Sequence, residues 1–217
     1  MILAIDTATR NVSLAVYDGQ QVLAEMTWQS ADHHTVELAP ALQNMLRLIR
    51  VVPGNLTALA VTIGPGSYTG LRIGMSLAKG LALAGMPPLP VVGVLTLDVI
   101  AAAQPHQADR LYAVAQAGRG RINVALYHWD GTRWQGNETP FITTWEGLAG
   151  RLTEPAQIAG EMTARGREVL SALDGLAIVV GAAQGLRRAG FLAELAWDRL
   201  RAGTADDPAR LAPLYLT

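Results

Sequence analysis

Short segments of the chain alternate hydrophobic and polar residues and are rich in β-branched residues, a pattern typical of half-buried strands. The segments 2–7, 12–18 and 21–28 follow this pattern, and the Asp18-Gly19 turn joins the last two as a hairpin. Longer stretches place apolar residues three or four positions apart, as in helices. The first half then continues with a helix at 35–50, a strand at 57–63, a helix at 71–84, a strand at 89–94 and a helix at 96–104.

A polar break, Gln104-Pro105-His106-Gln107, precedes a second series of elements. The pattern predicts strands at 110–116, 121–129 and 133–139, a helix at 144–152, a strand at 157–160, a helix at 163–173, a strand at 176–181 and a helix at 183–201. Both halves therefore read β-β-β-α-β-α-β-α, although no repeat of individual residues is visible. We predict an α/β protein of two lobes with mixed sheets, an N-terminal lobe at 1–104 and a C-terminal lobe at 105–217.

Composition favours a globular protein of neutral charge. The chain has 217 residues, half of them apolar, which is enough for a substantial core. Lysine and arginine total 17 against 18 aspartate and glutamate residues, so no overall basic field grips nucleic acid, and any RNA role is expected to run through a partner. The absence of cysteine excludes disulfides, a thiolate nucleophile and cysteine-ligated metal, and it fits a reducing cytoplasm.

Neither export nor membrane insertion is expected. The N-terminus lacks a basic region, and Asp6 interrupts its apolar run too early for a signal peptide. The segment 80–97 carries no charge, but Pro87, Pro88 and Pro90 would break a membrane-spanning helix. We therefore expect a cytoplasmic protein.

The segment 64–74, GPGSYTGLRIG, is the most unusual stretch, because it places four glycines between a predicted strand and a predicted helix. Backbone N–H groups at such a place can cradle a phosphate. The spacing GxGxxxG is one residue longer than the dinucleotide fingerprint, and no Lys-Ser or Lys-Thr pair follows as in a P-loop. The alternative is a tight turn whose glycines let the backbone pack closely and fix how the strand leads into the helix.

Candidate chemistry is sparse elsewhere. Asp6 and Thr7 end the first strand, where a nucleotide-binding α/β lobe would keep a carboxylate for magnesium and a hydroxyl for phosphate. The matching segment of the second half, 116–119, reads QAGR and has no carboxylate. Asp6 is therefore either part of a weak nucleotide site or a hydrogen bonder that holds the next turn. The histidines lack HExxH or HxxxH spacing and Ser67 lacks the GxSxG context, so we expect no catalytic residue, no metal site and no cofactor.

Two helices are more apolar than one core requires. In the segment 36–49 the apolar side chains fill an arc of about 180°, where about 100° usually suffices, and in the segment 71–84 the only polar side chains share one narrow stripe. Glycine and alanine four residues apart also form a ridge that permits close helix approach. The two helices are either enclosed in a core or form a protein interface. The predicted interface residues are Leu38, Leu42, Met45, Leu46, Ile49, Ile73, Gly74, Leu77, Ala78 and Leu81.

Three segments resemble the bacterial TsaB family, also called YeaZ: ILAIDTAT at 2–9, GPGSYTGLRIG at 64–74 and PLYL at 213–216. The resemblance extends over the whole chain in length and element order. It implies a fold like that of actin, sugar kinases and Hsp70. It also implies a role in forming N6-threonylcarbamoyladenosine at position 37 of tRNAs that read ANN codons.

In that family the related, metal-binding subunit TsaD transfers the threonylcarbamoyl group. The resemblance therefore implies a non-catalytic partner of TsaD that acts together with the ATPase TsaE, meets tRNA only through the complex, and forms a homodimer in isolation through the same helices. The chain departs from the family at 116–118, where QAG replaces Asp-Ala-Arg, and at the tail, which lacks the usual arginine. The first departure argues against the alternative function, a weak ATP-binding or ATPase enzyme with its site at Asp6 and Thr7.

Overall fold

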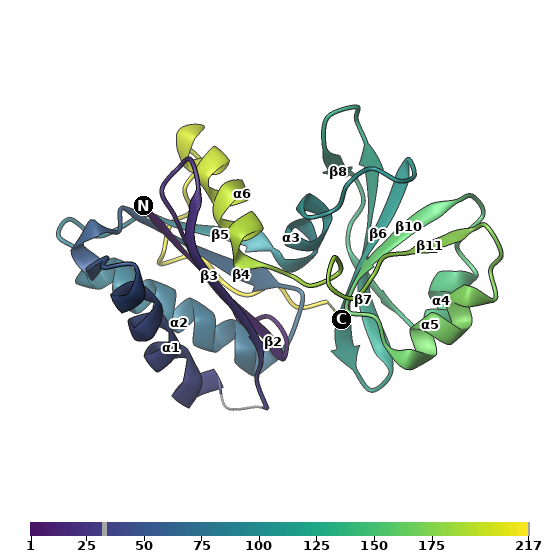
Figure 1. Cartoon of the computed structure of the whole chain (residues 1–217), viewed down its shortest axis with the longest axis horizontal. Coiled ribbons are helices and arrows are strands. Elements are labelled where there is room, and N and C mark those ends of the chain that lie inside the picture. The colour runs from purple at the N-terminus through teal and green to yellow at the C-terminus, as the bar shows by residue number, and fades with distance from the viewer. Residues whose placement is uncertain (32–33, 217) are drawn as a thin grey trace. The chain divides into compact units, whose positions relative to one another are not determined.

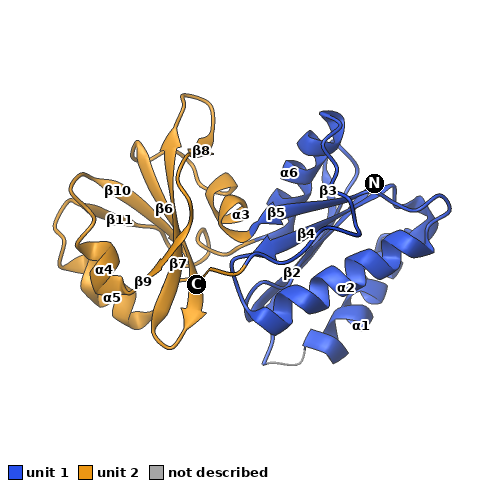
Figure 2. Cartoon of the chain, turned by 180° about the vertical axis from the view of Figure 1, so that it is seen from behind, with its two compact units in different colours: residues 1–95, 188–214 blue, residues 96–187, 215–217 orange. Residues whose placement is uncertain are grey.

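Two β-sheets with the same strand order form the centres of two compact units in the computed structural model, which describes residues 1–31 and 34–216. Unit 1 comprises Met1–Leu95 and Arg188–Leu214, and unit 2 comprises Thr96–Arg187 and the residues from Tyr215 onward. Figure 2 colours the two units separately. In the part of the chain that the structure describes, no helix combines the length and apolar character needed to cross a lipid bilayer.

The sheet of unit 1 has the order β3-β2-β1-β4-β5. Its strands are β1 (Ile2–Asp6), β2 (Asn11–Tyr17), β3 (Val22–Gln29), β4 (Ala58–Gly64) and β5 (Val91–Leu95). The first three strands pair antiparallel because short turns join them, whereas β4 and β5 follow helical crossovers and run parallel to β1. Every residue of β1 is buried, as expected for a central strand with helices on both faces.

Helices cover both faces of the unit 1 sheet. They are α1 (His34–Leu48), α2 (Tyr68–Ala84) and α6 (Ala189–Arg201), and a short 3-10 turn, η1 (Pro53–Asn55), follows α1. Figure 1 shows α1 and α2 on one side of the sheet and α6 on the other. The core beneath α1 and α2 joins side chains such as Leu42 and Met75 to Leu3, Ile5 and Val61 of the strands.

The six-stranded sheet of unit 2 repeats this topology in the order β11-β10-β6-β7-β8. Its strands are β6 (Arg110–Gly118), β7 (Arg121–Trp129), β8 (Trp134–Gly136), β9 (Phe141–Thr143), β10 (Ala156–Gly160) and β11 (Ala177–Val179). Within the range 133–139, where a third strand was predicted, the structure has only the short strand β8, and β9 lies beyond that range; both strands pair with β7. Pro140 lies directly before β9, and it has no N–H group with which to continue a ladder.

The helices of unit 2 are α3 (Thr96–Ala102), α4 (Trp145–Ala149) and α5 (Ala164–Ser171). The structure therefore divides the chain differently from the predicted lobes 1–104 and 105–217. The last helix of each half belongs to the unit of the other half, because Leu97 and Ile100 of α3 enter a core with Leu111 of β6, whereas α6 packs on β1 and β2. Apolar periodicity predicted both helices, but it contains no information about which sheet a helix covers.

Candidate functional site

The glycine-rich segment forms the turn between β4 and α2. Ser67 caps the helix, since its Oγ accepts a hydrogen bond from the N–H of Gly70 at 3.2 Å. The backbone N–H of Ser67 donates to the carbonyl oxygen of Ala8 at 2.6 Å, which ties the turn to the segment that follows β1. The helix consequently begins at Tyr68, three residues before the predicted start.

The glycines of this turn allow close backbone packing. A Cβ atom at Gly66 would collide with the carbonyl oxygen of Ala8, and one at Gly70 would collide with the carbonyl oxygen of Thr7. A Cβ atom at Gly74 would collide with the Thr7 hydroxyl oxygen. The structure thus favours the second interpretation of the motif, a turn that holds the end of β1 against the first turns of α2.

Asp6 and Thr7, the predicted nucleotide-binding residues, are 0% and 1% exposed. Asp6 Oδ1 accepts hydrogen bonds from the N–H of Ala8 at 3.0 Å and from the hydroxyl of Thr62 at 3.1 Å. The Thr7 hydroxyl donates to the carbonyl oxygen of Gly70 at 2.7 Å. Both side chains therefore take part in internal hydrogen bonds, and the alternative in which Asp6 holds the next turn agrees with this geometry.

Metal ligands are not gathered anywhere in the described ranges 1–31 and 34–216. No three side chains of histidine, cysteine, aspartate or glutamate in these ranges lie close enough together to hold an ion.

The C-terminal segment packs against the same turn. The N–H of Leu214 donates to the carbonyl oxygen of Ile63 at 2.6 Å, and a Cβ atom at Gly64, where φ is +109°, would collide with the carbonyl oxygen of Leu214. Lys79 of α2 donates from Nζ to the carbonyl oxygen of Leu211 at 2.7 Å. Two of the family segments, GPGSYTGLRIG and PLYL, are thus in contact, a relationship that sequence spacing does not reveal.

Six of the ten residues predicted for the partner interface are buried inside unit 1. The buried residues are Leu38, Leu42, Met45, Leu46, Gly74 and Ala78. Apart from Gly74, these residues have side chains that are at most 7% exposed, because both helices pack on the same sheet and on each other. The wide apolar arc is therefore used inside unit 1, and Gly70 and Gly74 of the small-residue ridge face Thr7. The other four residues, Ile49, Ile73, Leu77 and Leu81, are half-buried at its margin.

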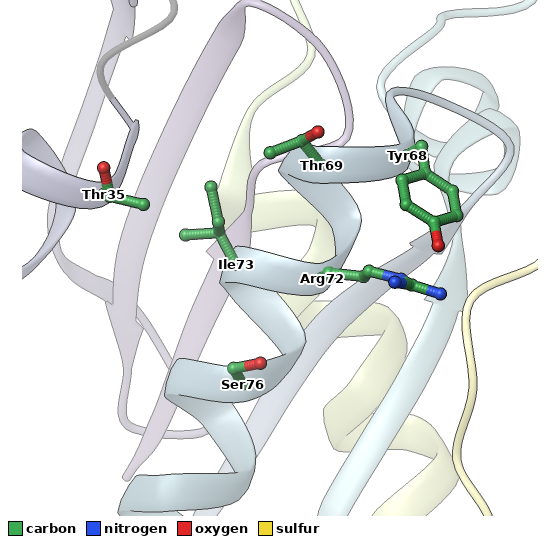
Figure 3. A pocket seen from close by; sticks show the side chains of 6 residues that line it. All are labelled: Thr35, Tyr68, Thr69, Arg72, Ile73 and Ser76. Atoms are coloured by element: carbon green, nitrogen blue, oxygen red, sulfur yellow. The ribbon is translucent and has the colours of Figure 1, made fainter.

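A shallow pocket of about 490 Å³ marks the accessible part of this surface. It is lined by Thr35 of α1 and by Tyr68, Thr69, Arg72, Ile73 and Ser76 of α2. Figure 3 shows Thr35 and Ile73 extending toward each other from the two helices, with Arg72 beside the ring of Tyr68. The Arg72 guanidinium lies 3.8 Å from the centroid of that ring.

This arrangement presents a cation stacked on an aromatic ring beside an aliphatic side chain, a combination that is frequent in protein interfaces. Among the lining residues only Ile73 was predicted. The sequence signal for the others was the polar stripe along the apolar helix, since Tyr68, Arg72 and Ser76 follow one another at intervals of four residues. On a helix whose apolar face is buried, the polar stripe identifies the accessible face.

Residues 21–169 match the family model described as "TsaD: tRNA N6-adenosine threonylcarbamoyltransferase". The chain is 36% identical to the tRNA threonylcarbamoyladenosine biosynthesis protein TsaB of Escherichia coli (strain K12) over 163 residues, which are 74% of this chain and 68% of that protein. It is 34% identical to the TsaB protein of Bacillus subtilis (strain 168) over 128 residues, 59% of this chain and 55% of that protein. The aligned part thus spans little more than half of the Bacillus relative.

Two solved structures show the fold. YeaZ from Pseudomonas aeruginosa superposes with a TM-score of 0.80 at 22% identity and covers 99% of each chain. The ROK hexokinase from Thermus thermophilus superposes with a TM-score of 0.50 at 13% identity and covers 92% of this chain and 99% of that one. The predicted actin- and sugar-kinase-like fold with two mixed sheets is confirmed. From the family match and the identity to the Escherichia coli protein, the chain belongs to the TsaB (YeaZ) family.

Proposed function

We propose that this protein is a non-catalytic subunit in the bacterial synthesis of N6-threonylcarbamoyladenosine at tRNA position 37, where it binds and activates the catalytic subunit TsaD. The observation that carries the proposal is the 36% identity to the TsaB protein of Escherichia coli, whose name describes a protein of this biosynthesis. The complex would also include TsaE, would contact tRNA through its other subunits, and would act in the cytoplasm.

The hydrogen bonds of Asp6 and Thr7 support a non-catalytic role. A carboxylate that acts on magnesium or a phosphate must have an oxygen directed at the ligand. In this chain Asp6 Oδ1 receives two internal hydrogen bonds and the Thr7 hydroxyl donates to Gly70, while both side chains are buried. These residues stabilise the turn before α2, so the chemistry is assigned to the partner.

The accessible side of α1 and α2 is the surface that we propose for TsaD. The pocket around Arg72 and Ile73 supplies a central cation and an aliphatic contact. Val36 of α1, next to Thr35, is 67% exposed, and Leu83 near the end of α2 is 74% exposed, which adds exposed apolar area to the two helices. Without TsaD, the same accessible side would pair with a second copy of the chain, so we propose a homodimer that gives way to the heterodimer.

Reversing the charge of Arg72 tests this surface. Arg72→Glu should weaken the association with TsaD by about 10- to 100-fold, the usual loss for an arginine near the centre of an interface. Arg201→Glu is the matched control, because Arg201 is an exposed arginine of α6, which covers the opposite face of the sheet. The measurement is retention of purified TsaD on the immobilised chain, followed by titration calorimetry.

A mass measurement of the isolated chain and of its mixture with TsaD completes the test. We expect a dimer that is replaced by a heterodimer, with Arg72→Glu shifting both equilibria toward monomer. Equal TsaD binding by the Arg72→Glu and Arg201→Glu variants would contradict the assignment of the surface. Failure of the unaltered chain to bind TsaD would contradict the proposed function itself.

A further inference from the structure

A polar pocket of about 360 Å³ opens on unit 2, far along the chain from the α1–α2 surface. Its lining includes Arg110, Tyr112, His128, Glu138, Phe141 and Arg151. These residues carry two guanidinium groups, an imidazole and a phenol but only one carboxylate, which is an unusual concentration of hydrogen-bond donors for a chain whose net charge is near zero.

Strand pairing brings most of these side chains together. Arg110 of β6 lies opposite His128 of β7, and two residues further along, Tyr112 lies opposite Leu126. Residues two apart on a strand share a face, so all four side chains project from the same side of the sheet. Arg151 comes from the segment after α4, and its guanidinium lies 4.4 Å from the centroid of the Phe141 ring of β9.

Several donors in the pocket have no partner in the protein. Within residues 1–31 and 34–216, Arg151 forms no ion pair, and neither the Tyr112 hydroxyl nor the His128 ring forms a hydrogen bond. Tyr112 is 5% exposed as a whole, but its hydroxyl is not among the fully enclosed side-chain atoms that lack a hydrogen-bond partner, so it reaches the pocket. A phenol that is almost buried and lacks a protein acceptor normally has its hydrogen bond completed by a ligand or by water in the adjoining cavity.

The second guanidinium is held only weakly. Arg110 Nε lies 3.5 Å from Glu154, and the two side chains are 31% and 62% exposed. An ion pair with this exposure contributes little free energy, so the arginine can exchange it for another anion at small cost. Arg110 and Arg151 can therefore both turn toward a ligand.

Several charged side chains influence the pKa of Tyr112. Burial raises the pKa of the Tyr112 hydroxyl, Arg110 and Arg151 oppose the rise, and Glu138 and Glu154 add to it. The phenol consequently stays protonated at neutral pH and remains a hydrogen-bond donor.

We propose that this pocket binds a phosphate group through Arg151, Arg110 and the Tyr112 hydroxyl. Guanidinium groups match phosphate oxygens with two parallel N–H donors each. Arg110 and Tyr112 belong to β6 and Arg151 follows α4, so the donors reach the pocket from two separate elements, which suits a tetrahedral anion better than a planar carboxylate. The phosphate belongs either to an RNA backbone or to a free nucleotide, and the site is independent of the proposed TsaD surface.

Substitutions at Glu138 and Arg151 should change phosphate affinity in opposite directions. Its carboxylate lines the same pocket and repels an incoming phosphate. Arg151→Gln should therefore weaken phosphate binding, by about tenfold for one charge-assisted hydrogen bond. Glu138→Gln should strengthen it, by about threefold for one charge on an exposed side chain. Both positions are exposed, so the variants should fold.

The experiment titrates the full chain with inorganic phosphate and with AMP at constant ionic strength, and follows the His128 ring signals by NMR. Unmodified tRNA is titrated separately by fluorescence anisotropy, with inorganic phosphate as competitor. Arg167→Gln is the matched control, because Arg167 is an exposed arginine of α5 in the same unit and does not line the pocket.

We expect the His128 signals to shift with millimolar phosphate. Phosphate should bind most tightly to the Glu138→Gln variant, less tightly to the unaltered chain and most weakly to the Arg151→Gln variant. If tRNA binding falls in Arg151→Gln but not in Arg167→Gln, the phosphate is that of RNA. If only phosphate and AMP depend on Arg151, it is that of a free nucleotide. Unmoved His128 signals, or equal effects of Arg151→Gln and Arg167→Gln, would overturn the proposal. TsaD binding by Arg151→Gln should be unchanged, which separates this site from the proposed function.

Discussion

The substitution Gly70→Ala tests whether the glycines of the turn between β4 and α2 serve packing or ligand binding. Gly70 lies in the first turn of α2, and its carbonyl oxygen accepts the hydrogen bond of the Thr7 hydroxyl at 2.7 Å. A Cβ atom at this position would lie well under 3.0 Å from the carbonyl oxygen of Thr7. Because that atom belongs to the backbone, no side-chain rotation can relieve the collision.

The expected magnitude follows from three contributions. Displacing a well-packed backbone segment costs about 2 kcal/mol, and distortion of the Thr7 to Gly70 hydrogen bond costs about 1 kcal/mol. Alanine in place of glycine favours the helix by up to about 1 kcal/mol. The free energy of unfolding should therefore fall by about 2 kcal/mol, which corresponds to a decrease in Tm of roughly 4–8 °C for a chain of this size.

Urea denaturation followed by circular dichroism measures the change, and Gly80→Ala is the control. Gly80 lies in the same helix, it is exposed, and no heavy atom lies within 4 Å of a Cβ atom built there. The same substitution should stabilise the protein at this position by up to about 1 kcal/mol. The two variants thus share a helix and a chemical change but are expected to have opposite signs.

A Gly70→Ala variant as stable as the unaltered chain, or more stable, would refute the packing argument. Unchanged stability combined with a loss of ATP binding would instead favour the phosphate-cradle interpretation of the motif. A gain at Gly80 with a loss at Gly70 agrees with the close approach of β1 and α2.

Two further predictions concern charged groups. Arg187→Met removes the partner of Glu161 from an ion pair whose side chains are 0% and 6% exposed, so the free energy of unfolding at pH 7 should fall by about 3 kcal/mol. The double variant with Glu161→Leu should recover part of that loss in urea titrations, and an unchanged single variant would contradict the prediction. Burial, together with Asp198 and Glu25, raises the pKa of Glu194. The folded protein therefore binds a proton at Glu194 more readily than the unfolded chain does, and the ionised carboxylate lowers the free energy of unfolding at neutral pH. Glu194→Gln should stabilise the protein at pH 7 by no more than about 0.5 kcal/mol, after allowance for solvent screening. The stability difference between the two proteins should vanish below pH 4.5, the ordinary pKa of glutamate, where the carboxyl is protonated in both the folded and the unfolded state. A difference that grows on acidification would refute the prediction.

The order and type of the elements could be predicted from the sequence because they depend on nearby residues. Alternation and helical periodicity identified the segments 2–7 and 121–129 as strands and 71–84 as a helix. The errors at their ends are also local, for example the Ser67 cap that starts α2 at Tyr68. The strand predicted at 133–139 is also shorter than expected, since β8 ends at Gly136.

The function of individual apolar residues required the tertiary structure. Periodicity placed Leu42, Met45 and Ala78 on broad apolar faces, but these faces are buried against the sheet and between α1 and α2. A periodic pattern shows which residues share a face and does not show what covers that face. The accessible surface accordingly lies at the polar stripe of α2, around Arg72.

The sequence by itself determined the family, the order of the elements and the doubled strand order, because each is set by short motifs or by residues a few positions apart. Only the tertiary structure decided that α3 and α6 each belong to the unit of the other half, and that the glycine-rich turn holds the C-terminal segment. It also decided that Arg110 and Arg151 share a pocket. These relationships join residues as distant as Lys79 and Leu211, 132 positions apart. Local propensity does not encode such contacts, because they depend on which surfaces remain uncovered once the sheets have formed.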